Sequence, residues 1–195
     1  MDYIEKINEI DEYAKSKLSS SRYKHSVQVA KMCEKLCVNA GYEKYKGYLA
    51  GISHDICKEI SEKKMLKLAQ KDDLPISKSE EAKISLLHGR AAAILLKEKF
   101  KIDDEDIINA VRYHVSGNIK MNEFAMCLYI ADKSEPTRPH ITKEYLDNLF
   151  SMPIIKMMDF VLTENIEHLK KKNYTIYEQT FLLQNEIKER LNINE

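Results

Sequence analysis

Glycine and proline, the two residues that interrupt helices most strongly, are scarce in this chain, with five glycines and four prolines among 195 residues. Lysine, glutamate, leucine and isoleucine, which are compatible with helices, are frequent instead. Near the N-terminus Ile4, Ile7, Ile10 and Ala14 lie three or four positions apart, the spacing of one helical face. We therefore predict an all-α protein.

Short polar breaks divide this helical pattern. The first helix should end before the serines at 19–21, the second at Gly41, and a third should run from about Tyr45 to Lys58. Asp103 and the acid three residues later resemble a capping box, which predicts a helix ending at His114. Breaks at Pro153 and near 173–174 predict three more helices beyond residue 142.

No composition shift or linker separates these segments. We expect one domain over residues 1–195, a helical bundle with its core at about 20–140 and C-terminal helices at about 142–191 packed on it.

Charge and composition exclude several classes of protein. The 31 basic and 31 acidic residues cancel, so no net field attracts nucleic acid or an anionic membrane. No apolar run approaches the roughly 20 residues of a membrane span, and no signal peptide is visible. The four cysteines form no paired CxxC motifs and are expected to be reduced core thiols. We expect a cytoplasmic protein.

Four histidines and two aspartates form an ordered set along the chain: His25, His54, Asp55, His88, His114 and Asp132. Imidazole and carboxylate together suit iron, manganese, zinc or cobalt. Six ligands are too many for one tetrahedral ion and suit two octahedral ions with open positions. A pair of ions activates hydroxide at neutral pH and clamps a phosphate oxygen. The set therefore indicates a metal-dependent phosphohydrolase.

The adjacent pair in this set suggests how two ions would be shared. His54 and Asp55 are about 100° apart around a helix, so the carboxylate can bridge two ions while the imidazole binds one. His25 and Asp132 would complete the first ion's shell, and His88 and His114 would serve the second. His140 and His168 fall outside the pattern and are interpreted as ordinary surface or helix-end residues.

Longer segments around these residues carry a resemblance to a known family. The chain resembles the HD-domain metal-dependent phosphohydrolases, and among them the bacterial YqeK-type symmetrical diadenosine tetraphosphate (Ap4A) hydrolases. The matching segments are RYKHSVQVA (22–30), AGISHDICKE (50–59), LLHGRAAAILL (86–96), DDEDIINAVRYHVSGN (103–118) and YIADKSEPTR (129–138).

This resemblance implies cleavage of Ap4A into two ADP molecules at a dinuclear centre, with iron as the expected metal and manganese, cobalt or zinc as alternatives. It implies the six metal ligands given above, with Asp55 bridging. It also implies that Asp55 and Lys58 act in catalysis and that Lys58 holds a substrate phosphate. Further candidates for substrate binding are Arg138, Arg22, Lys133 and Ser116. The expected partner is a small dinucleoside polyphosphate, and a homodimer is left open.

The chain departs from this family's usual pattern at three positions. Val115 and Ser116 stand where two threonines are common, and Ser53 stands where leucine is common. Arg90 is as compatible with a solvent-exposed position as with a functional role. Glu59 is a candidate ion-pair partner of Lys58.

Other functions remain compatible with the same residues. These are another nucleotide phosphohydrolase (a nucleoside monophosphatase or a guanosine polyphosphate hydrolase), a non-catalytic nucleotide-binding module, and a di-iron oxygenase.

Overall fold

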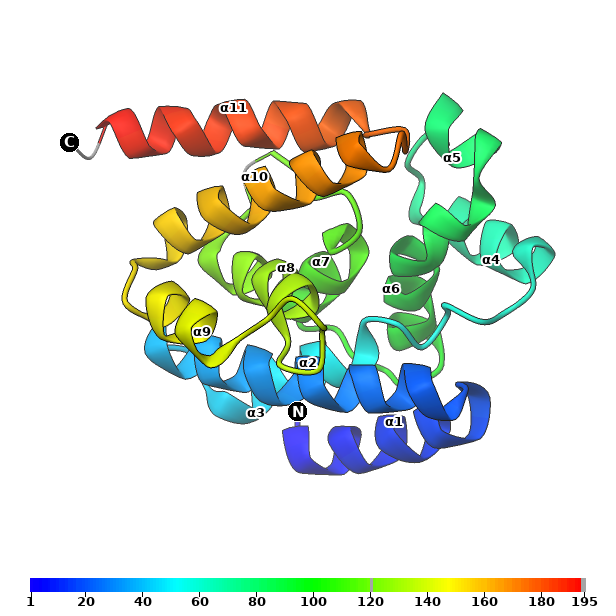
Figure 1. The fold of residues 1–195 in the computed structure, drawn as a ribbon. Helices are drawn as coiled ribbons and strands as arrows, with labels where there is room; N and C mark the ends of the chain where they lie inside the picture. The colour runs from blue at the N-terminus through cyan, green and yellow to red at the C-terminus, as the bar shows by residue number, and fades with distance from the viewer. Residues whose placement is uncertain (120, 194–195) are drawn as a thin grey trace.

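The computed structural model describes residues 1–119 and 121–193, and these residues form helices and no strands (Figure 1). The prediction of an all-α protein is confirmed. The α-helices within the described residues are α1 (Tyr3–Lys17), α2 (Ser20–Asn39), α3 (Lys44–Ser53), α4 (Glu62–Ala69), α5 (Lys78–Ala82), α6 (His88–Glu98), α7 (Glu105–Tyr113), α8 (Glu123–Ser134), α9 (Lys143–Phe150), α10 (Ile154–Lys171) and α11 (Glu178–Ile193). None of these helices is both long enough and apolar enough to cross a bilayer.

The helix α8 forms the centre of the fold. In Figure 1 it lies between α2 on one side and α10 on the other, and both helices pack against it. Eight consecutive residues of α8, from Phe124 to Ala131, are buried. One continuous hydrophobic cluster extends from Ile10 in α1 to Ile187 in α11. This continuity supports a single domain over residues 1–195, which stays a prediction.

Helices α2 and α3 approach each other backbone to backbone. A methyl group on Gly51 would lie 2.4 Å from the Cα atom of Ala30 and 2.8 Å from its backbone nitrogen. Only a residue without a side chain allows this approach. His25 lies on α2 before this crossing point and His54 lies directly after α3, so the close contact sets how far apart these two histidines can be.

The third helix is shorter than predicted, ending at Ser53 and not near Lys58. The Gly51 carbonyl would normally accept from the backbone N–H of Asp55, but the His54 Nδ1–H donates to it at 2.7 Å. The chain then continues in turns, in which the Lys58 N–H donates to the Asp55 carbonyl at 2.8 Å. The imidazole thus ends the helix and frees the backbone to turn at Asp55.

Two expectations from the sequence are corrected. The N-cap of α7 is Asp104 and not Asp103, because the Asp104 carboxylate accepts from the Asp106 and Ile107 N–H groups.

Glu59 does not pair with Lys58 in the structure. Its carboxylate accepts from the backbone N–H of Ser19 at 2.6 Å and from the Ser19 hydroxyl at 2.8 Å, and Ser19 caps α2.

Arg90 is buried, with 7% of its surface exposed, so a solvated role is excluded. Its guanidinium donates to the Asp72 carboxylate at 2.6 and 2.8 Å and to Glu80 at 3.2 Å. It also donates to the carbonyls of Leu74 and Pro75. One buried cation therefore holds the segment between α4 and α5.

The close approach of α2 and α3 generates a stability prediction. Gly51→Ala should lower the free energy of unfolding by about 1–3 kcal/mol, because the added methyl overpacks the contact with Ala30. Alanine is otherwise favoured over glycine within a helix by about 0.5–1 kcal/mol, so the expected sign is opposite to the intrinsic preference. Urea unfolding measures the change. An unchanged or higher midpoint would contradict the packing described here.

Candidate metal centre

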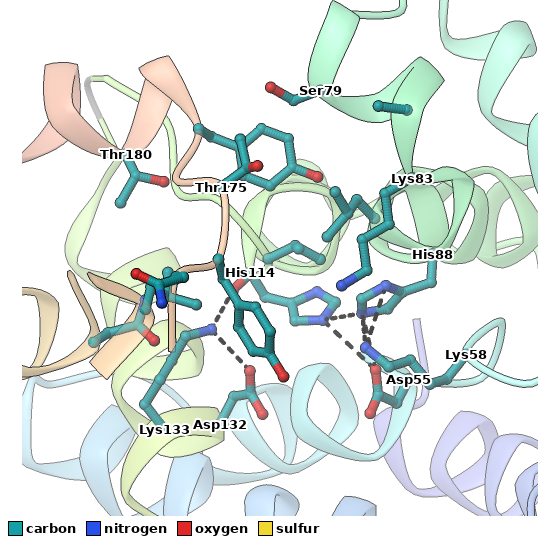
Figure 2. A pocket seen from close by; sticks show the side chains of 18 of the residues that line it. Asp55, Lys58, Ser79, Lys83, His88, His114, Asp132, Lys133, Thr175 and Thr180 are labelled. Atoms are coloured by element: carbon teal, nitrogen blue, oxygen red, sulfur yellow. Dashed lines mark hydrogen bonds and ion pairs between the residues drawn. The ribbon is translucent and has the colours of Figure 1, made fainter. Parts of the chain in front are cut away.

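The structure brings all six sequence-predicted metal ligands to one place. They come from different helices and mostly from helix ends. His25 lies in α2, His54 caps the end of α3, His88 begins α6, His114 caps the end of α7, and Asp132 lies in the last turn of α8. Figure 2 shows Asp55, His88, His114 and Asp132 converging at the floor of a cavity.

Asp55 stands between two pairs of histidines. Its Oδ1 atom lies 3.1 Å from His88 Nε2 and 3.7 Å from His114 Nε2. Its Oδ2 atom lies 3.3 Å from His54 Nε2 and 4.0 Å from His25 Nε2. Each carboxylate oxygen therefore faces a different pair, which is the arrangement a bridging ligand requires.

Asp132 completes the side of the site that contains His25 and His54. Its Oδ1 atom lies 3.1 Å from His25 Nε2 and 3.8 Å from His54 Nε2. Ligand atoms of His25, His54 and Asp55 lie within 4.8 Å of one another, and so do those of Asp55, His88 and His114. The two triplets share Asp55.

The histidine nitrogens at this site present lone pairs to one another. The Nδ1 atoms of His88 and His114 each donate to a backbone carbonyl at 2.7 Å, which leaves both Nε2 atoms without a proton when the rings are neutral. These two Nε2 atoms nevertheless lie 3.0 Å apart. The Nε2 atom of His54 is buried with no hydrogen-bond partner. Unprotonated Nε2 atoms that converge in this way form a suitable site for metal cations, which bind nitrogen ligands only when these carry no proton.

The surroundings favour the protonation states of metal ligands. Burial raises the pKa of Asp55, but the charge of the neighbouring His54 is the largest of the opposing effects, which together hold that pKa well below its ordinary value. For Asp132, burial is likewise outweighed by Lys133 and His25. Both carboxylates are thus ionised.

Burial has the opposite effect on two of the histidines. It lowers the pKa of His88, and it lowers the pKa of His114 to about 3, so both rings are neutral near pH 7. The pKa of His54 is raised, because the attraction of Asp55 exceeds the effect of burial.

A cavity of about 600 Å³ opens above the carboxylates. Its wall contains the sequence-predicted cations Arg22, Lys58, Lys133 and Arg138. Lys58 Nζ lies 3.2 Å from His88 Nε2, and burial lowers the pKa of Lys58. Arg22 Nη1 donates to Asp55 Oδ2 at 2.9 Å. Anionic substrates would meet several cations directly over the candidate ligands.

Two of the candidate substrate-binding cations also hold the site together. Lys133 Nζ donates to the His114 carbonyl at 2.7 Å and to Asp132 Oδ2 at 2.9 Å. Arg138 donates from Nε and Nη2 to the Asp132 carbonyl, and from Nη2 to Asp132 Oδ1 at 3.2 Å. These bonds fix Asp132, a role that the sequence did not indicate for either residue.

Ser116 is not among the residues that line the cavity, whereas its neighbour Val115 is. The Ser116 hydroxyl donates to the Gly117 carbonyl at 3.0 Å. The structure therefore does not bring this sequence-predicted residue to the site.

Sequence reasoning also missed residues that the fold brings to the cavity. The segment between α10 and α11 contributes Tyr174, Thr175 and Tyr177, and the region of α5 contributes Ser79 and Lys83 (Figure 2). The two tyrosines are among eleven spread along the chain, so no local pattern distinguished them. A further missed residue is Glu135, whose Oε1 atom lies 3.2 Å from His25 Nδ1.

Comparison with protein-family models matches residues 22–137 to the HD domain, a span that contains all six candidate ligands. The chain belongs to the HD domain family. This match confirms the resemblance to the HD-domain family stated from the sequence segments. The C-terminal helices α9–α11 lie outside the matched HD-domain residues.

Relatives of this HD-domain protein extend the similarity beyond the matched span. A Staphylococcus aureus protein named symmetrical bis(5'-nucleosyl)-tetraphosphatase is 30% identical over 86% of this chain and 87% of its own length. A Bacillus subtilis protein of the same name is 28% identical over 88% and 91%. A crystal structure of a predicted HD superfamily hydrolase involved in NAD metabolism, from Clostridium acetobutylicum, matches with a TM-score of 0.86 and 27% identity over 94% and 97%.

The position of Asp55 between the histidine pairs generates a prediction for metal content. Asp55→Asn keeps the size of the side chain but removes the charge that faces all four rings, so the metal content per chain should fall to less than half of the wild-type value. Elemental analysis of the purified protein measures this content. His140→Ala, at a histidine outside the cluster, is the control and should leave metal content unchanged. Equal metal content in Asp55→Asn and in the wild type would contradict the role of Asp55 as a ligand shared by the two histidine pairs.

Proposed function

We propose that this protein hydrolyses Ap4A symmetrically, breaking the anhydride between the second and third phosphates to give two ADP. The observation that carries the proposal is the shared carboxylate of Asp55, which faces two histidine pairs beneath a cavity lined by cations. Relatives similar over most of the chain are named for this activity, and they support the choice of substrate.

Two metal ions are proposed to bind the six converging side chains, with Asp55 shared between them. His25, His54 and Asp132 would hold one ion, and His88 and His114 would hold the other. We propose iron as the metal, although nitrogen and oxygen ligands also suit manganese, cobalt and zinc. When bound, such a pair supplies Lewis acidity to the phosphoryl group and lowers the pKa of water.

The cations of the cavity are proposed to bind and orient the tetraphosphate. Lys58 lies beside His88 and would contact the phosphoryl group that is attacked. Arg22, Lys133 and Arg138 surround the two carboxylates and would neutralise the remaining phosphates. Fixed positive charge at the reacting phosphate stabilises the transition state more than the substrate, because charge develops there during the reaction.

A second cavity, of about 510 Å³, offers a place for the other half of the substrate. Lys133, Arg138 and Asn165 line both cavities, so the two are adjacent. The second is also lined by Tyr145 and His168, whose rings could contact a base. With one adenosine in each cavity, the central anhydride would lie over the metal ligands, and cleavage there gives two equal products.

The proposed partner is therefore a small nucleotide, and we propose a cytoplasmic location. The four cysteines are buried and unpaired, which agrees with a reducing compartment. A homodimer is compatible with this function, and light scattering of the purified protein would test it.

The decisive experiment is product analysis of metal-quantified protein incubated with Ap4A, using ion-exchange chromatography. Two ADP per substrate, lost in His54→Ala, is the expected result. ATP plus AMP would retain the metal site but exclude symmetrical cleavage. Free phosphate or pyrophosphate from other nucleotides, with no turnover of Ap4A, would indicate a different phosphohydrolase.

Removing the cation nearest the candidate ligands should separate catalysis from metal binding. Lys58→Ala should reduce kcat by about 10²- to 10³-fold, the range for a single group that stabilises developing charge. Metal content should remain at the wild-type value, because the two ligand triplets do not include Lys58. Lys97→Ala, on the exposed part of α6, is the control. Loss of metal together with activity would contradict the role proposed for Lys58.

The second cavity can be tested with a substrate that has one adenosine. His168→Ala should raise KM for Ap4A by about 2- to 5-fold, as expected for the loss of an aromatic contact worth about 0.5–1 kcal/mol. The KM for adenosine 5'-tetraphosphate should not change, because that nucleotide leaves the second cavity without a base. Lys170→Ala, on the same helix but not lining the cavity, is the control. An equal rise for both substrates would exclude an adenosine at this position.

A further inference from the structure

The four histidines of the metal centre are not held in the same way. In three of them Nδ1–H donates at 2.7 Å to the carbonyl three residues earlier in the chain; the pairs are His54 with Gly51, His88 with Ser85, and His114 with Val111. A carbonyl only accepts, so these bonds fix the proton on Nδ1 and leave Nε2 free. His25 has no such bond to its own helix. Its Nδ1 atom instead lies 3.2 Å from Glu135 Oε1.

Glu135 is itself firmly held. It is 2% exposed, and its second oxygen, Oε2, accepts from the Thr137 N–H at 2.7 Å and from the Thr137 hydroxyl at 2.6 Å. Oε2 is therefore committed to two donors, while Oε1 faces the imidazole. An ionised carboxylate offers acceptors on both oxygens, and only such a group satisfies Thr137 and His25 Nδ1–H together.

We propose that Glu135 is a positioning residue that keeps the proton of His25 on Nδ1, so that Nε2 is free to bind metal. The inference rests on the proposed metal-dependent function. A carboxylate behind a histidine ligand fixes the tautomer and orientation of the ring, and also raises its basicity. Glu135 thereby does for His25 what the helix backbone does for the other three histidines.

Glutamine at this position gives a counterintuitive expectation. The two Thr137 donors require an oxygen at the Oε2 position, so the amide NH2 of Glu135→Gln must face His25. The NH2 group donates hydrogen bonds and could not accept one from the His25 Nδ1–H. The imidazole proton would then move to Nε2, which points to Asp132 at 3.1 Å, and would occupy the place of a metal ion. The variant closest in shape should therefore be the most harmful to metal binding.

Three variants separate this role from a merely structural one. Glu135→Gln should weaken metal binding by about 10- to 100-fold, the range for loss of a partner behind a ligand. Glu135→Ala, which allows His25 either tautomer, should weaken it less. Thr137→Val disturbs the same turn but keeps the carboxylate, and should bind metal like wild type. Zinc titration measures all three, and circular dichroism checks that each is folded.

Nitrogen-15 NMR of the histidine rings at pH 8 provides a readout that does not depend on activity. With zinc added, His25 should carry its proton on Nδ1 in the wild type and on Nε2 in Glu135→Gln. If Glu135→Gln keeps the Nδ1 proton and wild-type affinity while Glu135→Ala loses affinity, Glu135 only braces the turn and the proposal is overturned. Failure of the wild type to bind zinc or to hydrolyse Ap4A would instead overturn the proposed function.

Discussion

Buried negative charge is the constraint on which the arrangement of this protein depends. The carboxylates of Asp55 and Asp132 lie at the junction of helices far apart in the sequence, and an unpaired charge in such a place would strongly destabilise the fold. Imidazoles and cations surround them. These partners come from α2, α6, α7 and α8. The pairing that stabilises the two carboxylates in the fold therefore also brings the candidate ligands together.

Much of this could be predicted from the sequence because the signals are local. Glycine and proline positions, helix spacing and capping residues fix most helices, and the order of histidines and aspartates marks the candidate ligands. The end of α3 could not be predicted in the same way. An uninterrupted apolar pattern continues past Ser53, but the imidazole of His54 takes the carbonyl that the next turn would need. A side-chain bond overrode backbone propensity there.

The sequence was less informative where a residue's role depends on what folds against it. Arg90 has no distinctive neighbours in the chain, yet it is buried and binds a segment 10–18 residues away. The SEPTR segment was expected to contact substrate through Arg138. In the structure Arg138 lines the cavity and also holds Asp132, and Glu135 of the same segment contacts His25. A short motif of charged residues shows which chemical groups are present. It does not show which partner each side chain contacts in the folded protein.

The bonds between histidine Nδ1 atoms and backbone carbonyls connect the metal centre to the ends of its helices. His54 and His114 cap α3 and α7, and each donates to a carbonyl in the final turn of its own helix. Fraying of that turn would rotate the ring away from the centre, and a bound ion would resist the rotation. Because a bound metal ion would require these rings in place, metal binding at the candidate centre would be coupled to the order of the turns at the ends of α3 and α7.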